Sequence, residues 1–331
     1  MNNNQFTRRK FLNIAKLSVL FLLTSCKGLP KKISIGFYKH FLPVSFIKLL
    51  PKNWKKENYN YKRDNLNKNF RDQNIILIND GWLNKVDLRD FSNISDPLLN
   101  YLDKRSKNYL SNWELPKREK IYPIGVIPYA IIIKNNERYK ITNKNNWDFI
   151  LSKDLFGKMV LPNSPRILIS IAERINKKNA IKSIINQDNI YDDINAIDWL
   201  TKTDAALAIL PLTICKKYLK IDSRLSLVFP DQGVPLMWNF LLFKNNFNQT
   251  ILFDWLDKLL HKNSINKLLR DGLYLPFNNE YIQSKYKDKP KYTRFLNRPS
   301  EECWKNSWSF NSLIESEKFE LENIWKKSLA P

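Results

Sequence analysis

The side chains that could support covalent chemistry are few. The only histidines are His40 and His261, and a histidine-activated nucleophile needs one of them. His261 lies in the polar end of a helical segment, where a solvated cap is the simpler interpretation. His40 follows the first expected strand, where it could contact a ligand. The sequence therefore favours binding without covalent chemistry, and we expect that the protein is not an enzyme.

Motifs of common catalytic and cofactor sites are missing from the sequence. It has seven glycines, with neither a glycine-rich phosphate loop nor a Gly-x-Ser-x-Gly elbow. The acid pairs Asp192-Asp193 and Glu301-Glu302 lie in polar segments typical of solvated surface. No histidine, cysteine and aspartate cluster has metal-ligand spacing. We therefore expect neither a metal nor a cofactor, and an exported hydrolase remains only as an alternative.

The first 25 residues have the pattern of an export signal. A charged start with Arg8 and Arg9 precedes an apolar run from Phe11 to Leu23, and small residues lead to Cys26. The run is shorter than the roughly 20 residues of a membrane-spanning helix. The paired arginines resemble a twin-arginine signal, and Leu-Thr-Ser-Cys resembles a lipoprotein box. The pattern predicts a periplasmic protein anchored to a membrane by lipid on Cys26, with residues 26–32 as a tether.

The other two cysteines are Cys215 and Cys303. They lie 88 positions apart, and the sequence does not decide whether they pair. Cys215 follows the apolar run 205–214, which favours a buried free thiol.

The protein is strongly basic, with 55 Lys and Arg against 32 Asp and Glu and a formal charge of +23. Such a balance often indicates a nucleic-acid partner. Here the charge is spread along the sequence and comes mainly from lysine, which is typical of compositional drift. The export signal also argues against this partner, so we expect no nucleic acid.

Short apolar runs alternate with helical segments, which predicts an α/β fold with mostly parallel sheets. Runs at 33–38 and 74–78 are expected strands, the second covered on both faces. The polar run Lys55–Arg71 is interpreted as a solvated connection. Pro123 and Pro128 interrupt the apolar stretch Ile121–Lys134, which predicts a broken strand where the polypeptide crosses between two lobes. We place lobe 1 at 33–127 plus about 236–285, and lobe 2 at 128–235 plus about 286–331.

Several segments, in order, resemble the periplasmic spermidine/putrescine-binding proteins of ABC transporters. These segments are 33–43, 75–82, 124–134, 147–166, 228–233, 238–244, 273–278 and 321–329. The resemblance extends over about 290 residues and implies the type II periplasmic binding protein fold, in which two lobes close on a ligand through a hinge.

The resemblance also implies which residues contact the ligand. Aromatic rings hold the methylenes of the solute, and carboxylates pair with its amines. The implied ligand-binding residues are Tyr38, Lys39, Asp80, Gly81, Trp82, Tyr129, Ser164, Arg166, Trp238, Asn239 and Tyr274. For Tyr38, Trp238 and Tyr274 the competing interpretation is ordinary core burial.

The sequence departs from this family where amines would be bound. Ser164-Pro165-Arg166-Ile167 replaces Asp-x-x-Glu, Asn239 replaces an aspartate, and Lys39 replaces a small polar residue. An ammonium without a counter-charge costs several kcal/mol to bury. Lys39 and Arg166 therefore favour an anionic or zwitterionic solute over a polyamine, with Asp80 as the remaining carboxylate.

These residues predict a monomeric solute-binding protein that delivers a small solute to an ABC permease. The same fold serving as a sensor or scaffold without a solute is the first alternative, and the exported hydrolase is the second.

Overall fold

The structure is a computed structural model that describes residues 32–38, 42–59, 70–134, 146–278, 298–311 and 315–329. The strands are β1 (Ser34–Tyr38), β2 (Lys55–Tyr59), β3 (Ile75–Asn79), β4 (Tyr122–Lys134), β5 (Met159–Leu161), β6 (Ile190–Tyr191), β7 (Leu207–Pro211), β8 (Leu225–Val228), β9 (Pro235–Phe243) and β10 (Trp308–Ser309). The α-helices are α2 (Val44–Leu49), α4 (Asp80–Leu83), α5 (Asp96–Leu99), α6 (Lys104–Ser111), α7 (Lys117–Lys120), α8 (Pro165–Ala172), α9 (Ala180–Ile185), α10 (Ala196–Lys202), α11 (Leu212–Leu219), α12 (Ile251–Leu259), α13 (Lys262–Arg270), α15 (Glu301–Asn306) and α16 (Glu315–Leu329). Short 3-10 helices are η1 (Leu88–Asp90), η2 (Trp147–Leu151) and η3 (Lys153–Leu155).

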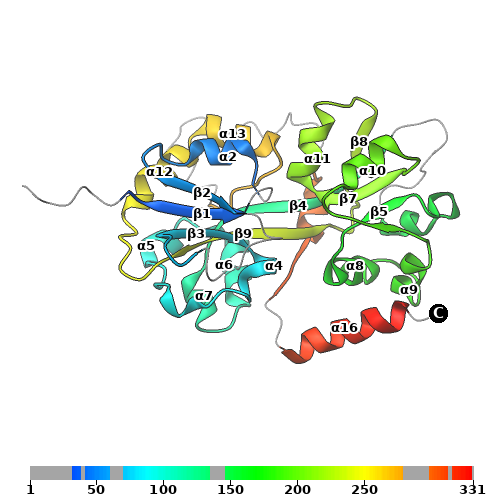
Figure 1. The fold of residues 1–331 in the computed structure, drawn as a ribbon, viewed down its shortest axis with the longest axis horizontal. Helices are drawn as coiled ribbons and strands as arrows, with labels where there is room; N and C mark the ends of the chain where they lie inside the picture. The colour runs from blue at the N-terminus through cyan, green and yellow to red at the C-terminus, as the bar shows by residue number, and fades with distance from the viewer. Residues whose placement is uncertain are drawn as a thin grey trace, which may run out of the picture.

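The strands of the described residues form one sheet with two halves. Its order is β2-β1-β3-β9-β4-β7-β5-β6, with β10 added to β9 and β8 added to β4. We call the half around β1, β2, β3 and β9 lobe 1, and the half around β5, β6, β7 and β8 lobe 2 (Figure 1). Neighbouring strands are parallel, except that β3 pairs antiparallel with β9, and β4 pairs antiparallel with β7, β8 and β9. The expected α/β architecture is therefore confirmed.

The crossing strand β4 is continuous over thirteen residues. It pairs with β9 as far as Pro128 and with β7 from Tyr129 onward, so one strand belongs to both lobes. The expected break was wrong. A register shift between Pro123 and Gly125 accommodates the first proline, and Pro128 lies where the pairing partner changes. The residue bounds of the lobes remain a prediction.

The solvated connection expected at Lys55–Arg71 was also wrong in its first part. Lys55–Tyr59 is β2, which pairs in parallel with β1 at the edge of the sheet. Its sequence KKENY is polar because an edge strand meets solvent, and edge lysines discourage pairing with other proteins. Tertiary pairing with β1 thus overrides a weak local preference.

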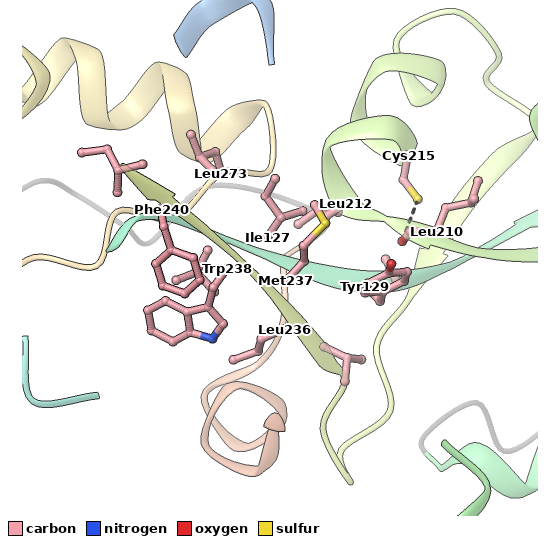
Figure 2. Packing of buried hydrophobic residues seen from close by; sticks show 14 of the residues in the cluster. Ile127, Tyr129, Leu210, Leu212, Cys215, Leu236, Met237, Trp238, Phe240 and Leu273 are labelled. Carbon is pink, nitrogen blue, oxygen red and sulfur yellow. Dashed lines mark hydrogen bonds between the residues drawn. The ribbon is translucent and has the colours of Figure 1, made fainter. Parts of the chain in front are cut away.

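Apolar runs form the strands at the centre of lobe 1. All five residues of β1 and all five of β3 are buried, as expected for strands covered on both faces. Along β9 the side chains alternate, with Trp238 and Phe240 on one side and Met237 on the other (Figure 2). On the Met237 side, Leu273 packs so closely on Gly125 that a Cβ there would lie 2.7 Å from Leu273 Cδ1.

Cys215 and Cys303 are both buried free thiols. No helix in the described ranges combines the length and apolar character needed to cross a membrane.

Candidate functional site

Residues from both lobes meet where the strands of lobe 1 end. β1 ends at Tyr38 and β3 ends at Asn79, directly before Asp80 at the start of α4. In lobe 2, β5 leads to Ser164 and to α8, which carries Arg166. The charges of Asp80 and Arg166 influence each other's pKa, so these two side chains lie near one another at what we call the lobe junction. Binding sites of open α/β sheets form beyond such carboxyl ends of strands.

Aromatic rings line the lobe 1 side of the junction. Tyr38 is 1% exposed, and its ring centroid lies 6.2 Å from that of Trp82 in a stacked arrangement. Phe70 meets Tyr38 edge-on at 5.5 Å. Lys85 Nζ lies 4.4 Å from the centroid of the Trp82 ring, while Gly81 beside it is exposed. The sequence thus brings Tyr38, Asp80, Gly81 and Trp82 together.

Asp80 is the half-buried carboxylate of the junction. Its Oδ1 accepts a hydrogen bond from Gly81 N at 3.0 Å, whereas Oδ2 is inaccessible to solvent and has no hydrogen-bond partner. Burial raises the pKa of Asp80 to about 7, although the N–H groups of Trp238 and Gly81 and the charge of Arg166 act in the opposite direction. Asp80 therefore changes charge near neutral pH, and its Oδ2 makes no hydrogen bond of ordinary geometry.

The guanidinium of Arg166 is already held by the protein itself. It donates to the backbone oxygen of Asn311, and its Cζ lies 4.8 Å from the centroid of the Phe310 ring. Burial lowers the pKa of Arg166, while the nearby Asp80 acts to raise it. Ser164 is the half-buried N-cap residue of α8, and its side chain makes no capping hydrogen bond. Arg166 thus lies near Asp80 at the junction with its Nη2 engaged by the protein, and its role toward a ligand remains a prediction.

Trp238 is oriented toward the interior of lobe 1. It is fully buried, and its ring stacks on that of Tyr109 with centroids 4.3 Å apart. Trp238 Nε1 donates to Ser309 Oγ at 2.8 Å, and Tyr109 Oη donates to the backbone oxygen of Phe310 at 2.8 Å. These contacts fit the core interpretation of Trp238 better than open contact with a solute.

Asn239 lies on the opposite face of β9 from Trp238. It is 0% exposed, and neither Oδ1 nor Nδ2 has a hydrogen-bond partner. Asn79 is directly opposite it on β3; Asn79 Nδ2 contacts Met237 Sδ at 3.6 Å, and its Oδ1 is also unpartnered. Buried polar groups in proteins are nearly always paired, and each unpaired one costs about 1–3 kcal/mol. These two amides therefore mark a spot where an added polar partner is favoured.

The two remaining tyrosines lie in different places. Tyr129 is the first residue of β4 to pair with lobe 2, and burial together with the charges of Asp193 and Asp80 raises its pKa. Tyr274 stacks on Trp304 with centroids 4.6 Å apart and pairs with Val126. Because Val126 also pairs with β9, Tyr274 lies on the far edge of β4, separated from Asp80 by two strands.

Lys39 and His40 lie outside the described residues, as do Cys26, Arg8 and Arg9, so their proposed roles remain predictions. His261 is the N-cap residue of α13, which confirms its interpretation as a cap. The described residues contain no group of three or more His, Cys, Asp or Glu side chains that could hold a metal ion.

Sequence reasoning did not identify Asn79, Tyr109, Phe310 or Asn311 as residues of the junction. Asn79 had a usable signal because it ends an apolar run immediately before Asp80. Tyr109 and the segment 308–311 had none, since they reach the junction only through contacts between distant parts of the sequence.

No protein-family model matches the sequence, and no curated protein matches it. Solved structures do match. A spermidine/putrescine ABC transporter substrate-binding protein from Streptococcus pneumoniae aligns with a TM-score of 0.63 and 11% identity, over 89% of this chain and 98% of that chain. A lipoprotein of Treponema pallidum gives 0.61 and 12%, over 89% and 98%. A two-component system protein described as mediating signal transduction gives 0.60 and 14%, over 88% and 99%.

These similarities establish the fold along nearly the whole length of each compared protein. The protein has the two-lobed α/β fold of ABC transporter substrate-binding proteins, as its sequence resemblance implied.

Proposed function

We propose that this protein is the extracytoplasmic solute-binding component of an ABC importer. The fold supports the proposal, because two lobes that share the crossing strand β4 can rotate about it and enclose a solute between them. The carrying observation is the set of unpartnered polar atoms at the junction, Asp80 Oδ2 together with Asn79 Oδ1 and the side chain of Asn239. In this proposal a bound solute supplies their missing partners.

The charges of the described junction restrict the class of solute. Arg166 is held by Asn311 and Phe310, and Lys85 lies over the Trp82 ring, so the described cations beside the site already contact groups of the protein. Asp80 is the half-buried carboxylate, and the amides of Asn79 and Asn239 are neutral. We infer a small polar solute with one ammonium group, which includes zwitterions such as amino acids. A polyamine would leave further ammonium groups without counter-charges.

The export and anchoring steps follow from the sequence. Arg8 and Arg9 would direct export, and lipid on Cys26 would tether the protein beside a permease in the membrane. A monomer suffices for this role. A genome neighbourhood with permease and ATPase genes favours transport, and its absence favours the sensor alternative, which the similarity to a signal-transduction protein supports.

A thermal-shift screen tests the proposal directly. A solute that binds only the folded state raises Tm. At a concentration one hundred times its Kd, it adds about 2.7 kcal/mol to the free energy of unfolding. We expect glycine, alanine or ethanolamine to raise Tm, and citrate and spermidine to have no effect. Calorimetric titration then confirms the stoichiometry. Tight binding of spermidine or putrescine contradicts the proposed solute class, and a flat response to a wide panel contradicts solute binding itself.

Restoring a carboxylate tests the role of Asn239. We expect Asn239→Asp to increase the affinity for putrescine relative to ethanolamine by about tenfold or more, because a second buried carboxylate pairs with the second ammonium group. Asn239→Ser is the control, since it shortens the side chain without adding charge. Titration calorimetry of both variants with both amines gives the ratio. An unchanged ratio in Asn239→Asp places Asn239 away from the solute.

A further inference from the structure

The segment Trp308–Asn311 connects the two lobes at the junction. It follows α15, and its first two residues form β10, which pairs in parallel with β9 at Pro235 and Leu236. The backbone N–H of Trp308 donates to Val234 O at 3.2 Å. Three residues separate this segment from α16, which packs on α8 and α9 of lobe 2 (Figure 1). We call Trp308–Asn311 the latch segment.

Lobe 1 holds the latch segment through α6 and β9. Tyr109 Oη donates to Phe310 O, and Trp238 Nε1 donates to Ser309 Oγ, both at 2.8 Å. Just before the latch segment, the Arg105 guanidinium on α6 donates to Trp304 O at 2.7 Å. Hydrogen bonds from buried or charged donors of this kind contribute more than surface contacts.

Lobe 2 holds the same segment through two arginines. Arg166 donates to Asn311 O and lies over the Phe310 ring, and Arg174 Cζ lies 4.7 Å from the centroid of the Trp308 ring. Such cation–π contacts are stronger when they are partly desolvated, as Arg166 is. On the other side of the junction, Lys220 and Asp271 form an interlobe ion pair at 2.7 Å, but the lysine side chain is 62% exposed, so this pair contributes little.

We propose that Trp308–Asn311 is an intramolecular latch that holds the two lobes together using only groups of this protein. It accepts hydrogen bonds from Tyr109, Arg166 and Trp238 through Phe310 O, Asn311 O and Ser309 Oγ. The lobes then separate only when the contacts of both Arg166 and Arg174 with this segment break. Opening of the protein is thereby controlled by its own C-terminal segment, in addition to any solute.

Two variants weaken the lobe 2 anchor of the latch and leave the contact of Arg174 with Trp308 in place. Arg166→Ala removes the hydrogen bond and the cation–π contact, and Phe310→Ala removes only the half-buried ring, so that variant should fold even if the first does not. Arg89→Ala is the charge-matched control, because its side chain is 89% exposed and pairs locally with Asp87. Circular dichroism confirms that each variant is folded.

Small-angle scattering of the full-length protein without added solute measures the separation of the lobes. We expect the wild-type protein and Arg89→Ala to be equally compact, and Arg166→Ala and Phe310→Ala to have a larger radius of gyration. Amide exchange gives a second readout: the Trp308 amide should exchange about tenfold faster in both latch variants, while the Val126 amide, which donates to Tyr274 O, stays unchanged.

Compact folded latch variants with wild-type exchange at Trp308 overturn the proposal, and so does a wild-type protein that is already extended. Since no solute is added, these outcomes do not depend on whether the protein binds one.

Discussion

Asp80→Asn is expected to make the protein more stable above neutral pH and to weaken solute binding. The pKa of Asp80 is about 7 in the folded protein against an ordinary value of 3.8, because burial disfavours its charged form. The asparagine side chain has the same shape, can still accept the hydrogen bond from Gly81 N, and has no charge to desolvate. The variant thus removes a cost that the wild-type protein bears at its site, as functional residues often do.

The sign of the pH dependence follows from proton linkage. Between about pH 4 and pH 7 the folded state keeps a proton on Asp80 that the unfolded state has released, so wild-type stability falls as pH rises through this window. Below it both states are protonated, and above it both are charged. The stability gain of Asp80→Asn therefore grows from near zero at pH 4 to about 2 kcal/mol at pH 8, after allowance for solvent near the half-buried residue.

Thermal unfolding of both proteins from pH 4 to pH 8 measures this gain, which corresponds to a rise in Tm of about 3 °C at pH 8. Asp87→Asn is the control, and we expect it to lower Tm instead of raising it. Arg89 lowers the pKa of Asp87 to about 2, so the charged form that this variant removes is the favoured one. The same Asp80→Asn protein should bind an ammonium solute about 100-fold more weakly. A Tm difference that is constant with pH would show that Asp80 is not buried as described.

Local sequence was sufficient where a residue type and its immediate neighbours decide the structure. The apolar run of β3 predicts a buried strand, and the polar turn after it places Asp80 and Trp82 at the end of that strand. The prolines of β4 indicated where the polypeptide crosses between lobes, although the strand is not interrupted, since a register shift accommodates Pro123.

Local sequence was insufficient where distant segments decide the structure. Tyr109 and Phe310 are 201 positions apart, and nothing around either residue indicates that they share a hydrogen bond. Arg166 was expected to face the junction open to an anion, but Asn311 and Phe310 engage it from about 145 positions away. A short edge strand such as β2 is likewise defined by its partner β1 and not by its own polar residues.

Gly233→Ala is expected to destabilise the protein more than alanine at Gly81 or Gly157. Gly233 has φ of +91°, and a Cβ there would collide with the backbone carbonyl group of Asn306 and lie 2.5 Å from Ser307 N. These atoms belong to the backbone just before the latch segment, so they cannot move aside as the end of a flexible side group would. The neighbouring Val234 N donates to Ser307 Oγ, and this bond fixes the backbone before β9 against the backbone before the latch segment.

Two other glycines separate the causes of this effect. Gly81 has ordinary backbone angles, and its nearest Cβ neighbour would be Asn79 Oδ1 at 3.4 Å, so Gly81→Ala should leave stability nearly unchanged. Gly157 has φ of +68°, but a Cβ there would meet only Asp188 O at 4.0 Å, so Gly157→Ala should cost about 1 kcal/mol from backbone strain alone.

Gly233→Ala combines backbone strain with a backbone collision, and we expect a loss of about 3–5 kcal/mol in the free energy of unfolding. Urea unfolding of the three variants gives the order, with the midpoint for Gly233→Ala well below those of the other two. Because the collision separates Asn306 from Gly233, the surviving folded fraction should also show faster exchange at the Trp308 amide. Equal losses of stability in Gly157→Ala and Gly233→Ala would mean that the backbone at Gly233 does not pack on the backbone that precedes the latch segment. The latch segment would then lack the support on which its attachment to β9 depends.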